Sequence, residues 1–267
     1  MRPLGSSGPW HAGPITPRAT ALLAPNPGWM TLDGTNSWLL LEPGSTIAVL
    51  VDPGPDDPGH VDALVTAAAA HGARVGEILL THGHADHAAG ARALRERTGA
   101  PVRALDPGHR LGGEGLVDGD VVAVGGLELT VVATPGHTAD SLTFLLPADR
   151  ALLTGDTVLG RGSAVIVHPD GDLGAYLASL QRLERLAAEL DAAWVLPGHG
   201  PASPDPVTLL ADYRAHRQER LAMVASAMAG GVTDADALLD AVYPEVPDAL
   251  RWAAALSLQA QVEHLRR

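Results

Sequence analysis

Cysteine and lysine are both absent from the 267-residue sequence, and phenylalanine occurs only once. Without cysteine, the chain has no thiol nucleophile, no disulfide and no thiolate zinc site. Without lysine, all 18 basic residues are arginine, which also excludes Schiff-base chemistry and a phosphate-loop lysine. Any metal ion that this protein binds must therefore be held by histidine, aspartate or glutamate.

Long apolar runs are missing as well. No stretch of about eighteen uncharged apolar residues occurs, so we expect no membrane-spanning helix. The opening residues are rich in Pro, Gly and Ser and lack the apolar centre of a secretory signal, which predicts a flexible N-terminal extension over residues 1–14 and a cytoplasmic protein. The formal net charge of −13 argues against a broad electrostatic grip on nucleic acid, although a local basic channel stays open.

The length predicts one large domain with a small appendage. Over residues 15–206, short apolar strands alternate with turns and helical patterns, as is typical of an α/β domain. Over residues 207–267, apolar residues recur at helical spacing, with breaks at Gly230-Gly231 and Tyr243-Pro244. This last segment carries six arginines against eight acidic residues, so we interpret it as a packing or dimerisation segment rather than a nucleic-acid-binding one.

A cluster of ligand-type side chains follows the predicted buried strand 78–80. His82, His84, Asp86 and His87 share one turn, with Gly and Ala between them. These small residues let the backbone curl so that the side chains converge, and an isolated surface or core histidine does not explain four such groups. The stretch therefore predicts a metal site at the carboxyl end of a strand, where α/β units usually present their chemistry.

Three further ligand candidates follow later strands in the same style. His137 comes after the predicted strand 127–133, Asp156 after 151–154, and His199 after 193–196. Each is flanked by Gly, Pro or Thr, and a tight turn with Gly lets the backbone pass close while the side chain points inward. We therefore predict that all these side chains meet around one site.

Other polar and aromatic residues are candidates for supporting that site. Asp52 ends a predicted strand, where it either orients a ligand or only caps a turn, and Thr81 and Thr138 each adjoin a ligand histidine. Trp29 and Trp38 could line an apolar mouth, with core packing favoured for Trp38.

These residues and spacings resemble the metallo-β-lactamase superfamily. The match runs through His82-x-His84-x-Asp86-His87, then His137, Asp156 and His199, in that order. Within the superfamily the chain is similar to the group that contains beta-lactamase-like protein 2, on the strength of several further stretches: Asn26-Pro27-Gly28, residues 34–39, residues 155–160, and Tyr213, His216 and Arg217. The resemblance implies a four-layer αβ/βα sandwich over residues 15–206 and a small helical, winged-helix-like C-terminal domain over residues 207–267.

Carried over to this sequence, the resemblance implies a dinuclear metal site. One ion would be held by His82, His84 and His137, the other by Asp86, His87 and His199, with Asp156 bridging the two. Because imidazole dominates these donors, we expect zinc, two ions per chain, with iron or manganese as other metals that fit. Asp86 is also the candidate catalytic residue, since it could orient the attacking hydroxide or move its proton.

We therefore expect a metal-dependent hydrolase in which a metal-bridged hydroxide cleaves an ester or thioester. Two metal ions lower the pKa of a shared water molecule and polarise the carbonyl group, so no Ser, Cys or Lys nucleophile is required. The partner would be a small molecule or an acyl-carrier substrate. A homodimer would also be compatible with the helical segment.

Two alternatives keep the same fold. A single-strand endoribonuclease would hydrolyse RNA phosphodiesters with the same dinuclear site, and a groove built from Arg103, Arg110 and Arg161 would favour it. A mononuclear iron oxygenase would use one metal ion and only part of the ligand set.

Overall fold

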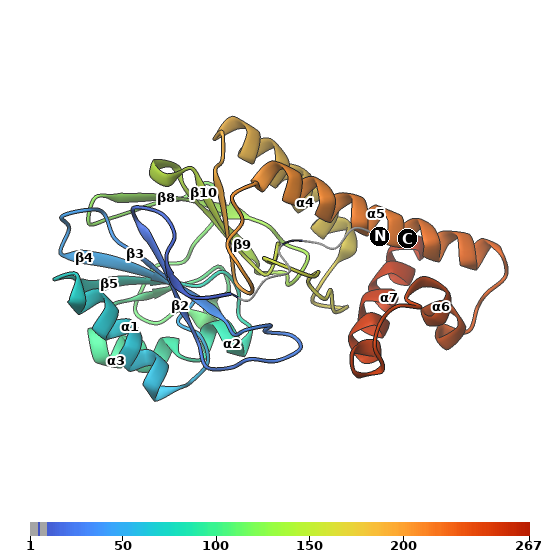
Figure 1. Cartoon of the computed structure of the whole chain (residues 1–267), viewed down its shortest axis with the longest axis horizontal. Coiled ribbons are helices and arrows are strands. Elements are labelled where there is room, and N and C mark those ends of the chain that lie inside the picture. The colour runs from blue at the N-terminus through green and yellow to red at the C-terminus, as the bar shows by residue number, and fades with distance from the viewer. Residues whose placement is uncertain (1–4, 6–9) are drawn as a thin grey trace.

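Two β-sheets packed face to face form the centre of the protein, which the computed structural model describes at residue 5 and over residues 10–267 (Figure 1). The first sheet has six strands in chain order: β1 (Gly13–Pro14), β2 (Ala19–Leu23), β3 (Asn36–Leu40), β4 (Ile47–Val51), β5 (Arg74–Leu79) and β6 (Val102–Arg103). The second has five strands in reverse chain order: β11 (Trp194–Pro197), β10 (Ala151–Gly155), β9 (Leu142–Leu146), β8 (Leu127–Ala133) and β7 (Val121–Val124).

Side chains of the first sheet alternate between its two faces, as the period of a β-strand requires. In β3, Trp38 packs toward the second sheet, whereas its neighbour Leu39 packs among residues of the outer helices. These helices are α1 (Pro58–Ala70) and α3 (Ala91–Thr98). The carboxylate of Asp57 caps α1 by accepting a hydrogen bond from its first turn at 2.7 Å. Since α1 crosses over between β4 and β5, these two strands are parallel and end at the same edge of the sheet.

The second sheet is covered in the same way by α4 (Leu173–Glu189). In β10, Leu152 packs against this helix, whereas Leu153 packs toward the first sheet. Asp172 caps α4, because its carboxylate accepts a hydrogen bond from the backbone N–H of Ala175 at 2.8 Å. The chain then returns as β11, parallel to β10. These four layers, helices outside and two sheets inside, confirm the predicted αβ/βα sandwich.

The C-terminal region is helical, as predicted, and extends to one side of the sandwich (Figure 1). Its helices are α5 (Pro206–Ala229), α6 (Ala235–Val242) and α7 (Arg251–Arg266). Leu210 and Tyr213 of α5 join the hydrophobic core around α4, so the region is packed on the main domain. From residue 206 to residue 267, a stretch described in full, the chain forms no strand, so the expected winged-helix-like character lacks its β-wing.

The N-terminal extension predicted over residues 1–14 falls partly outside the described residues, namely at 1–4 and 6–9. Within its described part, Gly13 and Pro14 pair with β2, and the indole N–H of Trp10 donates to Asn36 Oδ1 at 2.8 Å. The end of this segment is therefore held on the sheet. The domain borders at 15 and 207 stay predictions. In the described part of the chain, no helix is both long and apolar enough to cross a membrane.

Candidate metal centre

The predicted ligands lie together at the edge where the carboxyl ends of four strands meet. His82 and His84 follow β5, His137 follows β8, Asp156 follows β10 and His199 follows β11. Asp86 and His87 stand on the short helix α2 (Ala85–Ala88), directly after the first two histidines. The structure thus brings together all seven side chains that the sequence singled out. Their role as metal ligands stays a prediction.

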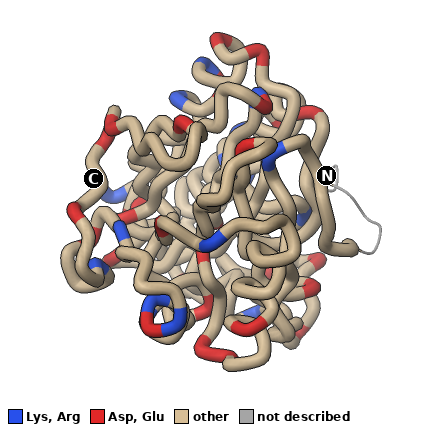
Figure 2. The backbone as a smooth tube through the Cα atoms, turned by 90° about the vertical axis from the view of Figure 1, so that its left-hand side faces the viewer, with Lys and Arg blue, Asp and Glu red and all other residues tan. Residues whose placement is uncertain are grey.

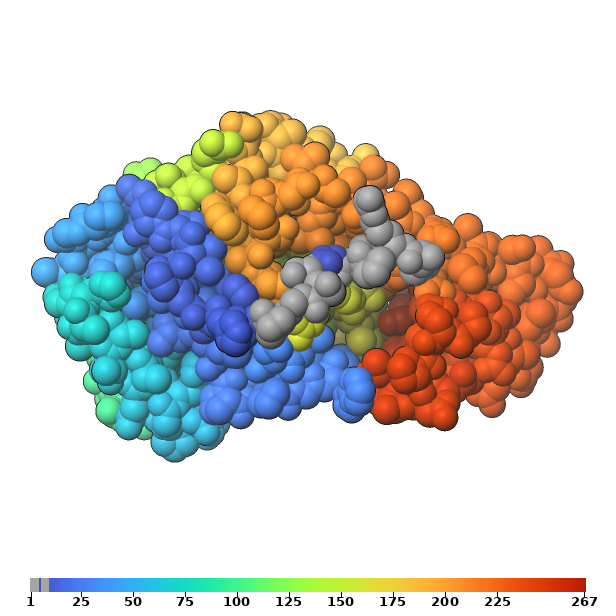
Figure 3. Space-filling model, viewed as in Figure 1, coloured from blue at the N-terminus to red at the C-terminus, as the bar shows by residue number. Residues whose placement is uncertain are grey.

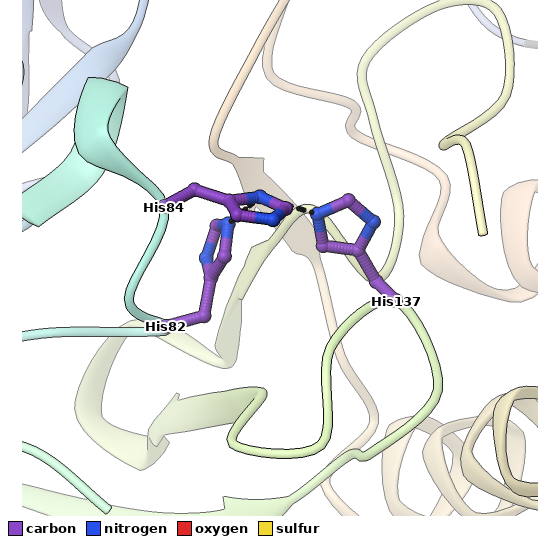
Figure 4. Close-up of side chains that lie close together, drawn as sticks. All are labelled: His82, His84 and His137. Atoms are coloured by element: carbon purple, nitrogen blue, oxygen red, sulfur yellow. Dashed lines mark hydrogen bonds between the residues drawn. The ribbon is translucent and has the colours of Figure 1, made fainter. Parts of the chain in front are cut away.

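Three histidines make up the first set of donors. The Nδ1 atom of His84 lies 3.0 Å from Nε2 of His82 and 3.1 Å from Nε2 of His137. Figure 4 shows the three rings pointing toward one another from two separate loops. His82 and His137 are buried, whereas His84 is exposed, so this set lies at the surface end of the site.

Asp86, His87 and His199 make up the second set. Nε2 of His199 lies 3.1 Å from Oδ2 of Asp86 and 3.2 Å from Nε2 of His87. The two histidines are buried, while the Asp86 side chain is 31% exposed. Asp86 is therefore the donor of this set that solvent or a substrate can reach.

The carboxylate of Asp156 lies between the two sets. Its Oδ1 is 3.4 Å from Nε2 of His87, and its Oδ2 is 3.4 Å from Nε2 of His199 and 3.8 Å from Nε2 of His137. Gly198 permits this position, because a Cβ atom there would lie 2.5 Å from Asp156 Oδ1. The placement agrees with the predicted bridging role.

One atom of this carboxylate tests whether the donors fit metal ions. Oδ1 of Asp156 is buried and has no hydrogen-bond partner among the described residues. A buried carboxylate oxygen that accepts no hydrogen bond is costly, and a cation in contact with it removes that cost. Five imidazoles and two carboxylates that face one another also form a donor set typical of transition metals. The residues present therefore fit bound metal cations.

Asp52 and Thr81 hold two of the rings in place, as proposed from the sequence. The Asp52 carboxylate accepts hydrogen bonds from the Thr81 backbone N–H at 2.8 Å and from its hydroxyl at 2.7 Å, and lies 2.9 Å from Nδ1 of His87. The Thr81 hydroxyl, which donates to Asp52, accepts from Nδ1 of His82 at 3.0 Å. Both rings therefore turn Nε2 toward the centre. Asp52 adopts a left-handed backbone with φ of 53° to make these contacts.

Backbone carbonyls hold two other rings. Nδ1 of His137 donates to the carbonyl oxygen of Val165 at 2.8 Å, and Nδ1 of His199 donates to that of Gly34 at 3.2 Å. Sequence reasoning missed both partners, since every residue has a carbonyl and no side chain marks these two. Thr138 has no such role, because its hydroxyl contacts Ser141 at 2.7 Å instead of a ligand.

Burial keeps two rings of the site neutral. The pKa of His82 lies well below its ordinary value because the ring is buried and because His87 and His137 are close. Burial also lowers the pKa of His137, against the attraction of Asp156. A neutral ring has a free nitrogen lone pair, which is the form that binds a metal ion.

The second set has the opposite charge pattern. Burial alone would raise the pKa of Asp156, but the charges of His199 and His87 hold it well below its usual range. Burial alone would lower the pKa of both histidines, but Asp156 raises that of His199 to about 9 and that of His87 well above its ordinary value. A metal cation bound by these side chains would replace their protons as the counter-charge of Asp156.

Comparison with known proteins agrees with this geometry. A sequence profile of the Metallo-beta-lactamase superfamily matches residues 30–199, a stretch that includes every predicted ligand. The chain belongs to this superfamily. The Beta-lactamase-like protein 2 homolog of Caenorhabditis elegans is 34% identical over 257 residues, which cover 91% of this chain and 83% of the relative. An Atrochrysone carboxyl ACP thioesterase of Aspergillus chevalieri is 33% identical over 218 residues, which cover 80% of this chain and 67% of the relative.

A solved structure leads to the same conclusion. A metallo-beta-lactamase family protein from Thermus thermophilus superposes with a TM-score of 0.75 at 26% identity, covering 94% of this chain and 93% of the other. The superfamily and the relatives named as thioesterases identify the chain as a metal-dependent hydrolase. The predicted resemblance and enzyme class are thereby confirmed, whereas the kind and number of metal ions stay predictions.

A cavity of about 270 Å³ opens beside the centre of this metallo-β-lactamase superfamily protein. His137 and Asp156 lie in its wall, together with residues of α5, of α7 and of the loop that carries Trp29. Figure 3 shows the hollow between the olive-coloured segment near residue 160 and the red C-terminal helices. Trp29 thus lies at an apolar mouth, as the sequence suggested, while Trp38 is 2% exposed and belongs to the core.

His216, on the wall of this cavity, gives a prediction for pH dependence. Burial and the nearby charges of Arg217 and Arg220 lower its pKa from 6.5 to about 4. Between these two values the unfolded chain binds a proton that the folded chain does not, so the free energy of unfolding falls as the pH is lowered through this window. When the pH is lowered from about 7 to about 5, we expect the free energy of unfolding to fall by about 1 kcal/mol less in His216→Gln than in the wild type. This figure includes a reduction for solvent screening.

Urea denaturation of the chelator-treated protein at both pH values measures this difference. The matched control is His71→Gln, because His71 is exposed at the end of α1. Equal losses in the wild type and in His216→Gln would contradict the assignment.

Proposed function

We propose that the chain is a zinc-dependent hydrolase that cleaves an ester or a thioester. The observation that carries this proposal is the position of Asp156, which lies between two complete donor sets and also lines the largely apolar cavity. A substrate whose apolar part fills the cavity would have its reacting carbonyl beside both sets. The thioesterase named among the relatives supports the same reaction class.

The proposal assigns a task to each part of the site. His82, His84 and His137 would hold one zinc ion, Asp86, His87 and His199 the other, and Asp156 would contact both. Bound zinc would polarise the carbonyl and make a water molecule acidic enough to attack it at neutral pH. Asp86, the partly exposed carboxylate, would orient that water molecule and take up its proton. Asp52 and Thr81 would fix the rings of His87 and His82.

An endoribonuclease has less support, because the arginines that would line its groove are engaged elsewhere. Arg103 donates to the carbonyl oxygen of Gly115, Arg110 donates to those of Ala104 and Leu105, and Arg161 pairs with Asp33 at 2.6 Å. Figure 2 shows basic residues scattered among acidic ones, with no continuous basic face in that view. An RNA backbone would need such a face.

A mononuclear iron oxygenase also has less support. It would use His82, His137 and Asp156 alone, and would leave the convergence of Asp86, His87 and His199 without a purpose. Metal analysis separates the two readings, since two zinc ions per chain support the hydrolase and one iron ion supports the oxygenase. The cytoplasmic location and the homodimer stay predictions.

The test is a direct comparison of substrates. Zinc-loaded protein is incubated with a labelled acyl thioester and, separately, with a short single-stranded RNA. We expect the thioester to be cleaved and the RNA to stay intact. His84→Ala and Asp86→Ala should each lower turnover by about a hundredfold or more, because each removes a ligand of one ion. RNA cleavage without thioester cleavage would contradict the proposal. Unchanged turnover in either variant would show that the site is misassigned.

A further inference from the structure

The cavity beside the metal centre is closed on its far side by one face of α7. Leu250 precedes this helix, and Ala253, Ala254 and Ser257 follow at positions three, four and seven residues later, so the four residues share one face. All four line the cavity, and the last three are 7–8% exposed. Because three of them are small, they leave open the volume that larger side chains would fill.

Two guanidinium groups in the wall of the cavity are held by partners within the protein. The guanidinium of Arg161 pairs with Asp33, and that of Arg217 donates to the carbonyl of Ala164 and lies 4.9 Å from the ring of Tyr176. The lowered pKa of His216 keeps this ring neutral at pH 7. Among the residues that line the cavity, the acidic side chain is Asp156, at the metal end. A ligand with a reactive polar end and an apolar body matches this arrangement.

The opposite rim carries two apolar side chains that are unusually exposed. Trp29 is 67% exposed and Met30 is 40% exposed, and both line the cavity. Their turn is held in place by Asn26, whose side chain accepts from the backbone N–H of Thr35 at 2.9 Å and donates to its hydroxyl at 3.0 Å. A fixed turn that presents a large apolar surface gains stability when an apolar ligand covers it.

We propose that this cavity, the acyl pocket, holds the acyl group of the substrate and that the α7 face sets the size of acyl group it accepts. The inference rests on the proposed hydrolysis of an ester or thioester and names its substrate class. The acyl pocket of about 270 Å³ is nearly twice the roughly 150 Å³ that accommodates benzene in an engineered protein cavity. It therefore suits a bicyclic aromatic acyl group or a chain of roughly eight to ten carbons, and an acetyl group would leave most of it empty.

Ala253 offers the sharpest test, because it lines the acyl pocket and does not belong to a hydrophobic core cluster of the described chain. Ala253→Leu adds three carbon atoms to the pocket wall. The matched control is Ala255→Leu, the same change on the exposed face of α7. For the rim, Trp29→Ala is compared with Trp252→Ala, since Trp252 is 52% exposed and lies outside the pocket.

The experiment measures kcat/KM of the zinc-loaded enzymes for acetyl, octanoyl and naphthoyl thioesters of N-acetylcysteamine. We expect the wild type to prefer the two larger substrates. Ala253→Leu should lower kcat/KM for them at least about tenfold and change that for the acetyl substrate less than about threefold. Trp29→Ala should raise KM for the larger substrates severalfold, and both controls should behave like the wild type. An unchanged ratio of large to small substrates in Ala253→Leu overturns the inference.

A binding measurement separates this inference from the proposed function. Octanoic acid is titrated into each zinc-loaded protein in a calorimeter. If the wild type hydrolyses no thioester, the proposed function fails, yet octanoic acid should still bind to the wild type and to Ala255→Leu and about tenfold more weakly to Ala253→Leu. Equal affinities in the two variants, or no binding to the wild type, would refute the acyl pocket itself.

Discussion

Asp156→Asn is expected to lower turnover on the order of 10⁴-fold and to reduce bound zinc below two ions per chain. The effect should exceed that of losing one histidine, because Asp156 lies within 3.4 Å of Nε2 of both His87 and His199 and within 3.8 Å of Nε2 of His137. Asparagine keeps the shape of the side chain but removes the charge that balances a cation. Both donor sets are therefore weakened by one substitution.

The measurement combines metal analysis after dialysis with steady-state kinetics on the best thioester substrate. Asp56→Asn is the matched control, since Asp56 is exposed on the loop before α1. Circular dichroism of each variant shows whether the fold is kept. A folded Asp156→Asn protein with the full zinc content and the wild-type rate would mean that this carboxylate holds no metal.

The sequence was sufficient to predict the ligand residues that follow the ends of strands. His82, His137, Asp156 and His199 each follow an apolar strand. The crossovers through α1 and α4 make β4 parallel to β5 and β10 parallel to β11, and the antiparallel pairs β8–β9 and β9–β10 turn the end of β8 to the same edge. Pattern and ligand type together were sufficient there, because the strand order of this fold leaves few other places for the side chains.

The residues that hold the ligand rings in place could be predicted only where a side chain makes the contact. Asp52 could be proposed because a carboxylate at the end of a buried strand is unusual and needs partners. The carbonyls of Gly34 and Val165 could not, because they come from loops without a distinguishing side chain. Thr138 was assigned by its place beside His137, and adjacency in sequence did not predict the direction of its hydroxyl.

The acyl pocket also lay beyond sequence reasoning. Helical spacing predicted a helix after the break at Tyr243-Pro244, but several faces of α7 carry Ala and Leu. Which face turns to the metal centre therefore depends on how α5 and α6 place the helix. The same limit applies to the missing wing. The resemblance implied a winged-helix-like domain, whereas residues 206–267 form α5, α6 and α7 and a short 3₁₀ helix over Asp248–Leu250, with no strand.

Phe144→Ala is expected to lower the free energy of unfolding by about 3–5 kcal/mol. Phe144 is the single phenylalanine of the chain and is 0% exposed. In β9 it pairs with Val131 of β8 and Leu153 of β10, and it packs in the core between the two sheets with Trp38 of β3. Removing its ring leaves a cavity that close-packed sheets cannot fill by small shifts. The loss is a large share of a total stability of roughly 5–15 kcal/mol.

Urea denaturation of the chelator-treated protein measures this loss without the contribution of bound metal. The matched control is Val121→Ala, because Val121 of the edge strand β7 is 60% exposed and its truncation should cost less than about 1 kcal/mol. The metal centre should weaken together with the core, since both sheets contribute strand ends to it, so Phe144→Ala should also lose zinc at a lower chelator concentration than Val121→Ala. A Phe144→Ala protein as stable as the control would show that the two sheets do not close around this ring, and the common edge on which the donor sets depend would then lack its physical basis.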